Sequence, residues 1–182
     1  LRPWIRNNGI DVRNVKGLQI ERVNIHNARS GGFVVSWDSS AVRVNDSSFT
    51  ANFFDGIALY ASHDIRIERF ICSSNQSAGI SIDNKLSDTV FEEGVLEGNG
   101  DVGIFVRDSR DLVFRNLQVL GNGSHGAFLS HQALGSGTGC SALIFQVCQI
   151  RNNQGAGFWL ASPAVDSPGN MVSGCLFAGN TG

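Results

Sequence analysis

A group of charged and polar residues in the middle of the chain could support proton chemistry beside a carboxylate. Arg107 directly precedes Asp108 and lies 24 residues after Asp83. Its planar guanidinium can bind a substrate carboxylate through two parallel hydrogen bonds. Removal of a proton alpha to a carboxylate builds up negative charge, so the reaction needs a cation there, a base and an acid. Tyr60, the only tyrosine, and His131 are the candidates for acid and base.

These residues also have simpler interpretations. Asp83, Arg107 and Asp108 could form exposed ion pairs, which contribute little to stability. His131 could cap a loop. Lys85 is a second cation that could bind the substrate carboxylate in place of Arg107. A calcium ion (Ca2+) could bind Asp83 and Asp108, but two carboxylates fall short of the six to eight oxygen ligands that calcium takes. We therefore predict no metal site and leave the cofactor open.

An internal repeat sets the positions of these residues. A glycine followed by an apolar-x-apolar triplet recurs at steps of 23, 24, 23, 24, 23 and 31 residues. The glycines are Gly9, Gly32, Gly56, Gly79, Gly103, Gly126 and Gly157. An asparagine lies four residues before most of them, at Asn52, Asn75, Asn99, Asn122 and Asn153, with Asn180 in phase. Because the glycines and the asparagines recur with the same spacing, the repeat is not a chance pattern.

The repeat predicts an all-β chain. Apolar residues alternate with period two, as in Ile65-Arg66-Ile67, and no window keeps a helical pattern without a glycine or asparagine. A coil of about 23 residues with three short strands buries its apolar side chains only by stacking on its neighbours. We expect a single parallel β-helix domain over residues 1–182, with about seven coils. The opening residues contain no initiator methionine and no signal peptide, so we expect a segment of a longer chain.

Inward-facing residues of successive coils should form columns. The two predicted columns are Ile10, Phe33, Ile57, Ile80, Ile104, Ala127, Phe158 and Val12, Val35, Leu59, Ile82, Val106, Leu129, Leu160. The asparagines should form a structural column at a turn, where they tolerate left-handed backbone geometry and bond to the next coil. Cys148 and Cys175 should stack inward and remain reduced, because side chains in parallel register discourage a disulfide.

Composition excludes several classes of function. The net charge is −2 and charged residues make up 16% of the chain, which argues against nucleic-acid binding. No apolar run reaches the roughly 20 residues of a membrane helix. We expect neither nucleic acid nor a membrane as a partner.

One outward row carries large rings at Phe105, Phe128 and Trp159. Stacked at about 4.8 Å per coil, these rings match the spacing of sugar units and could bind the apolar faces of pyranoses. They could equally pack against another copy of the chain, because exposed apolar strips often mark interfaces. Longer connections at residues 132–140 and 162–169 could wall this side of the molecule.

The repeats Asn75-Gln-Ser-Ala-Gly79-Ile-Ser-Ile-Asp83 and Asn122-Gly-Ser-His-Gly126-Ala-Phe-Leu-Ser130 resemble those of right-handed parallel β-helix proteins of the pectate-lyase-like superfamily. That superfamily includes polysaccharide lyases and mannuronan epimerases. The resemblance implies a carbohydrate-active protein that acts on an acidic polysaccharide by β-elimination or epimerisation, outside the cell or at its surface.

The resemblance covers nearly the whole chain but specifies function weakly. The segment from Phe53 to Tyr60 lacks the Tyr-Gly-Phe-Asp-Pro-His order of mannuronan epimerases. Whether the chain is an enzyme therefore stays open. The alternative is a non-catalytic β-helix: a glycan-binding, adhesin-like or tailspike-like segment whose aromatic ladder joins a homo-oligomer.

Overall fold

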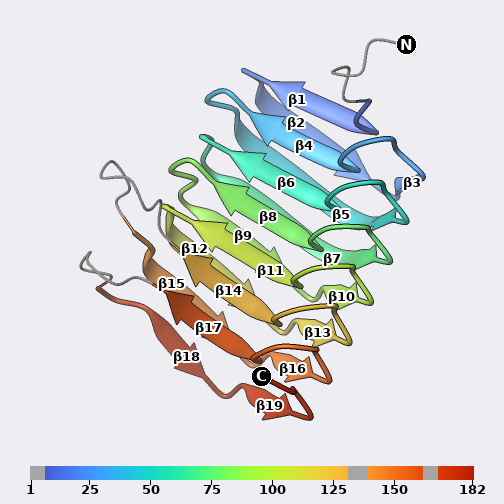
Figure 1. The fold of residues 1–182 in the computed structure, drawn as a ribbon. Helices are drawn as coiled ribbons and strands as arrows, with labels where there is room; N and C mark the ends of the chain where they lie inside the picture. The colour runs from blue at the N-terminus through green and yellow to red at the C-terminus, as the bar shows by residue number, and fades with distance from the viewer. Residues whose placement is uncertain (1–6, 131–138, 162–167) are drawn as a thin grey trace.

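The chain folds as a solenoid of stacked β-strands (Figure 1). The computed structural model describes residues 7–130, 139–161 and 168–182. Within these ranges there are nineteen strands and no helix, so no helix there is long and apolar enough to cross a membrane. Every strand pairing is parallel, as the repeat predicts.

Seven strands form one flat face of the solenoid, stacked in chain order in Figure 1. They are β1 (Ile10–Arg13), β4 (Phe33–Ser36), β6 (Ile57–Tyr60), β8 (Ile80–Asp83), β11 (Ile104–Arg107), β14 (Ala127–Ser130) and β17 (Phe158–Ala161). We call this the seven-stranded sheet. Each strand begins directly after one of the repeat glycines, so the glycine register fixes the pairing register.

A twelve-stranded sheet forms the other two sides of each coil. Its strands are β2 (Lys16–Glu21), β3 (Asn24–His26), β5 (Ser40–Thr50), β7 (Ile65–Ser73), β9 (Thr89–Glu92), β10 (Val95–Glu97), β12 (Arg110–Arg115), β13 (Gln118–Leu120), β15 (Ser141–Gln146), β16 (Gln149–Arg151), β18 (Met171–Ser173) and β19 (Leu176–Ala178). In β5 and β7 the expected second and third strands are continuous through the bend, at Asp46 and Arg69, both with positive φ.

The predicted core columns are confirmed. Partner residues run from Ile10 to Phe158 and from Val12 to Leu160 in the predicted order along the seven-stranded sheet. The column members in β4 to β14 are fully buried. In β17, however, Leu160 is 44% exposed, because no further strand of the described residues stacks on that side.

The asparagines form a continuous amide ladder inside the turn. Each side-chain amide donates to the Oδ1 of the next asparagine, from Asn52 through to Asn180, at 2.9 Å in every step. The same Oδ1 accepts the main-chain N–H of the preceding asparagine at 3.0 to 3.1 Å. The predicted structural column of asparagines at the turn is therefore confirmed.

The expected left-handed geometry of the ladder asparagines is wrong. The positive φ falls one residue earlier, at Ala51, Ser74, Gly98, Gly121, Asn152 and Gly179. The residue before each asparagine therefore adopts the left-handed conformation of the turn. The asparagine side chain itself lies inside the solenoid and not on its surface.

The cysteines are packed as reduced thiols. All four are free, and the main-chain N–H of Cys148 donates to Sγ of Cys175 at 3.4 Å. Burial raises the pKa of the Cys148 thiol to about 11, so the thiol is protonated at neutral pH. The expectation of stacked, unbridged cysteines is confirmed.

Candidate functional site

A groove follows the outward face of the seven-stranded sheet. Two hollows of about 260 and 510 Å3 meet at Tyr60, which lines both. The first runs toward Phe105 and Arg107, and the second runs toward Arg13 and Trp37. Side chains of this face come from alternate residues of each strand, so they point away from the core columns.

Small residues shape the groove next to Tyr60. Ala58 of β6 pairs with Ser81 of β8, which in turn pairs with Phe105 of β11. The short side chain of Ser81 leaves space between Tyr60 and the Phe105 ring, where the hollow of about 260 Å3 lies. Ala58 lines a smaller hollow of about 40 Å3, which Tyr60 also lines. The repeat thus places the polar side chain of Tyr60 near the aromatic ring of Phe105.

Arg107 and Asp83 form a bidentate ion pair in this hollow. Nε of Arg107 donates to Oδ1 of Asp83 at 2.9 Å, and Nη2 donates to Oδ2. This pairing raises the pKa of Arg107, and its guanidinium lies 5.8 Å from the centre of the Phe105 ring. Asp83 is only 6% exposed. The outer Nη1 edge of Arg107 has no hydrogen-bond partner among the described residues, so this edge can receive a ligand.

The structure repeats this arrangement at the other end of the groove. Nε and Nη2 of Arg13 donate to Asp11 at 2.9 and 2.6 Å, and the guanidinium lies 5.3 Å from the centre of the Trp37 ring. The hydrogen bond from Arg13 lowers the pKa of Asp11. Arg13 and Arg107 lie two strands on either side of Tyr60 in the sheet order. Sequence reasoning missed Arg13 as a site residue, although Arg13 ends β1 as Tyr60 ends β6.

Two further carboxylates line the groove and were not predicted. Asp55 is buried, and its Oδ1 accepts the main-chain N–H of Ala78 at 3.0 Å. Asp101 is exposed and has no ion-pair partner within the described ranges. Both lie in the turn just before a repeat glycine. That position in the repeat could have identified them from the sequence as residues near the groove. With Asp11 and Asp83 they give the groove four carboxylates against two guanidiniums.

The remaining predicted polar residues lie elsewhere. Lys85 is exposed in the turn after β8 and lines neither hollow. Asp108 is buried, and its Oδ1 accepts the main-chain N–H of Gly139 at 3.1 Å, so it supports the chain instead of facing a ligand. His131 falls outside the described residues, as do residues 132–138 and 162–167 of the long connections.

The two carboxylates considered for calcium do not fit a calcium site. Asp83 is already bound by Arg107 and by the main-chain N–H of Asn84, and Asp108 is bound by Gly139. No group of three or more His, Cys, Asp or Glu residues is placed to hold a metal ion in the described parts of the chain. We therefore derive no chemistry through a metal.

The predicted aromatic ladder exists, with one more member. The rings of Phe105 and Phe128 are 5.7 Å apart, and those of Phe128 and Trp159 stack at 4.9 Å. His125, which sequence reasoning did not select as a site residue, packs its ring edge-on against Trp159 at 4.5 Å. Trp159 is 46% exposed. The ladder therefore extends along the same outward face, from Phe105 at the edge of the groove toward the last coils.

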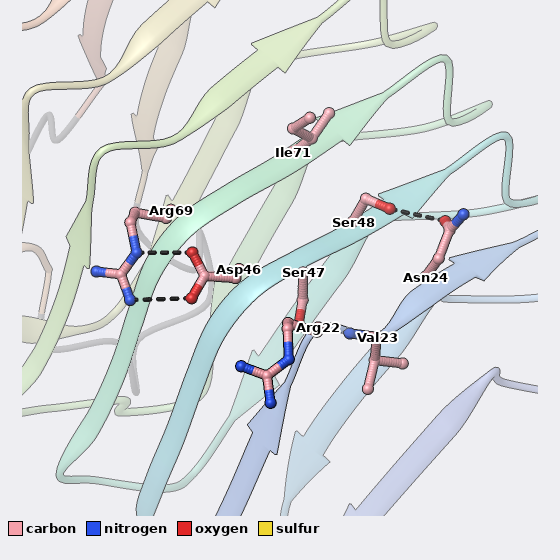
Figure 2. Close-up of a pocket in the computed structure, with 8 residues that line it drawn as sticks. All are labelled: Arg22, Val23, Asn24, Asp46, Ser47, Ser48, Arg69 and Ile71. Carbon is pink, nitrogen blue, oxygen red and sulfur yellow. Dashed lines mark hydrogen bonds and ion pairs between the residues drawn. The ribbon is translucent and has the colours of Figure 1, made fainter.

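A separate hollow of about 420 Å3 lies at the bend of the twelve-stranded sheet (Figure 2). There Arg69 donates to Asp46 at 2.7 and 3.2 Å, and Ser48 donates to Asn24 at 2.7 Å. Arg22 lies on the same side, with its guanidinium turned away from these pairs in Figure 2. Arg69 and Asp46 form an exposed ion pair, which contributes little to stability. None of the described residues that line the groove also lines this hollow.

Comparison with known proteins agrees with the observed fold. The family model described as "Right handed beta helix region" matches residues 4–90 and 34–182. The chain belongs to this right-handed β-helix family. The search of curated proteins gives no match.

Solved structures with the same fold include alginate epimerases. Periplasmic alginate epimerase AlgG superposes with a TM-score of 0.74 at 16% identity over 93% of this chain and 43% of that one, and a mutant form of AlgG gives 0.78 at 18%, over 93% and 42%. The A-module of the Azotobacter vinelandii mannuronan C-5 epimerase AlgE4 gives 0.71 at 16%, over 91% and 54%. The chain thus spans about half the length of these enzymes or less, and at this identity they share its fold.

Proposed function

We propose that the chain is a carbohydrate-active β-helix that binds an acidic polysaccharide along its groove and acts on it by epimerisation or β-elimination, outside the cytoplasm. The observation that carries the proposal is that Tyr60 and Arg107 line one hollow, next to the Phe105 ring. The fold shared with a periplasmic alginate epimerase and a mannuronan C-5 epimerase supports the choice of substrate and location.

In the proposed reaction a uronate carboxylate binds the outer edge of Arg107. Tyr60, acting as the base in its phenolate form, takes the proton on the carbon next to the carboxylate. The C–H electron pair moves into the carboxylate, and the guanidinium stabilises the resulting charge. Return of a proton to the opposite face gives the epimer, and loss of the neighbouring glycosidic oxygen gives an unsaturated product. His131 is our proposed second proton carrier, and Lys85 and Asp108 have no role in this scheme.

The acidity of the groove restricts how the substrate can lie. Four carboxylates face two guanidiniums, and both guanidiniums are already paired. An anionic chain must place its carboxylates against the free edges of Arg13 and Arg107 and away from Asp101. The bidentate pairs hold both guanidiniums in place before the substrate arrives, which lowers the entropic cost of binding.

Incubation with mannuronan and with polygalacturonate tests this function. We expect a changed epimer ratio by NMR, or unsaturated ends by absorbance, and a loss of at least a hundredfold in Tyr60→Phe. The double variant Asp83→Asn with Arg107→Gln should lose the same activity without leaving a buried carboxylate unpaired. Arg43→Ala is the matched control, because Arg43 pairs with Asp64 away from the groove. A polymer that stays unaltered with the wild-type chain would overturn the enzymatic proposal.

A non-catalytic oligomeric β-helix is the second candidate. The observation that favours it is the exposure of Trp159, and of Leu160 next to it. If neither polymer is altered, but association that depends on concentration disappears in Trp159→Ala, the aromatic ladder is an interface between copies.

A further inference from the structure

His125 is held against the aromatic ladder from three sides. Its ring packs edge-on against Trp159 at 4.5 Å and lies 5.7 Å from Phe128. The backbone of Gly155 closes the third side, where a Cβ would lie 2.6 Å from Nδ1 of the imidazole. A residue larger than glycine at that position would push the imidazole out of place, so the chain leaves room for this ring.

One hydrogen bond fixes the tautomer of His125. Its Nδ1 accepts the main-chain N–H of Ala156 at 2.9 Å, so in the neutral ring the proton is on Nε2. Asn8 and Asp55 occupy the same turn position in earlier coils, and they accept the N–H of Gly31 and Ala78 in the same way. A side chain with only a hydrogen-bond acceptor would therefore be enough to bind the main-chain N–H at this turn. His125 adds a ring and an N–H donor beside the exposed face of Trp159.

We propose that His125, Phe128 and Trp159 form a pyranose-binding subsite on the outward face, beyond the Phe105 end of the groove. The stacked rings of Phe128 and Trp159 offer an apolar surface to one face of a sugar, and Nε2–H of His125 donates to a sugar hydroxyl or ring oxygen. The inference rests on the proposed function, since it takes the ligand to be a glycan. It adds His125 as a binding residue and places a second anchoring point away from Tyr60.

The spacing of the coils sets the length of glycan that reaches this subsite. Tyr60 is on β6 and Trp159 is on β17, four strands apart in the sheet order. At about 4.8 Å per strand the separation is about 19 Å, close to four sugar units along an extended chain. A glycan centred on Tyr60 therefore contacts Trp159 only when it extends about four units in that direction. Affinity should rise steeply once this length is reached.

The test measures binding of defined oligomannuronates, from dimer to decamer, by titration calorimetry. The wild-type affinity should rise at least tenfold between tetramer and octamer. His125→Asn keeps an oxygen acceptor for Ala156 N–H, but its shorter side chain places no donor at the Nε2 position, and it should weaken octamer binding about fivefold, as expected for one net hydrogen bond. Trp159→Ala should weaken octamer binding about thirtyfold, as expected for a central aromatic anchor. Neither change should alter dimer binding.

Two outcomes and one control variant separate the claims. Equal octamer affinity in wild type, His125→Asn and Trp159→Ala, at unchanged melting temperature, would overturn the subsite. Tight, length-dependent binding that both variants weaken, without any chemical change in the oligomers, supports the subsite and refutes the proposed catalysis. His125→Phe retains a ring but has neither the acceptor nor the donor of the imidazole. If it weakens octamer binding at an unchanged melting temperature, the loss follows the Nε2 donor. A lowered melting temperature shows instead that the turn is disturbed.

Discussion

Replacing the central rung of the asparagine ladder should destabilise the whole solenoid. Asn99 is 1% exposed and makes four side-chain hydrogen bonds. Its Nδ2 donates to Asn122 at 2.9 Å and to the carbonyl of Cys72 at 3.1 Å, and its Oδ1 accepts from Nδ2 and N of Asn75 at 2.9 and 3.1 Å. At about 1 kcal/mol of net free energy for each bond, and more for a buried N–H left unpaired, Asn99→Ala should cost about 3–5 kcal/mol.

Urea unfolding, followed by circular dichroism and by tryptophan fluorescence, measures this loss. If the two signals give the same unfolding transition, a two-state free energy of unfolding can be calculated. Gln76→Ala is the control, because Gln76 is exposed in the same turn region, and it should stay within about 0.5 kcal/mol of wild type. A loss below about 1 kcal/mol in Asn99→Ala, with an unchanged m-value, would show that the ladder is not a stabilising element.

The other predictions concern charge, close packing and ionisation. Asp101→Asn should tighten oligomannuronate binding about twofold to threefold at low salt, because an exposed like charge is removed from the groove, and an equal or weaker affinity would refute an anionic ligand. Gly103→Ala should lower the melting temperature by about 5–10 °C, since its Cβ would meet the carbonyl of Gly126 at 2.7 Å; calorimetry showing no change would contradict the packing. The free energy of unfolding should fall as pH rises from the ordinary thiol pKa near 9 toward 11, because the folded state holds the Cys148 thiol protonated. Cys148→Val should flatten that part of the pH profile in urea titrations, and an unchanged slope would count against it.

The fold could be read from the sequence because a solenoid repeats its physical constraints at every coil. The glycine register and the alternation of apolar residues placed Ile57, Ile80 and Ile104 in one column, and the structure pairs them. The same alternation puts Tyr60, Asp83 and Arg107 at equivalent positions, the last residues of β6, β8 and β11, and they line one hollow. Strand periodicity therefore predicts which side chains share a face.

The remaining features depend on turns and on side-chain partners, which periodicity does not specify. Asp108 comes directly after Arg107 in the sequence, yet it turns inward to bind Gly139 in the following coil. His125 and Asp55 lie just before a repeat glycine, where their side chains accept a main-chain N–H of the next coil. The pairing of Arg107 with Asp83 depends on side-chain conformations, so the sequence alone left two opposite interpretations of the same residues.

Proton exchange at the carbon beside the uronate carboxylate tests the central claim most directly. Mannuronan and polygalacturonate are incubated with the chain in D2O, and loss of the H-5 signal is followed by 1H NMR. Our account predicts that deuterium enters this position in at least one polymer, and that Tyr60→Phe stops the exchange while still binding the polymer. If H-5 stays fully protonated with the wild-type chain bound to both polymers, the groove binds glycans without the proposed chemistry.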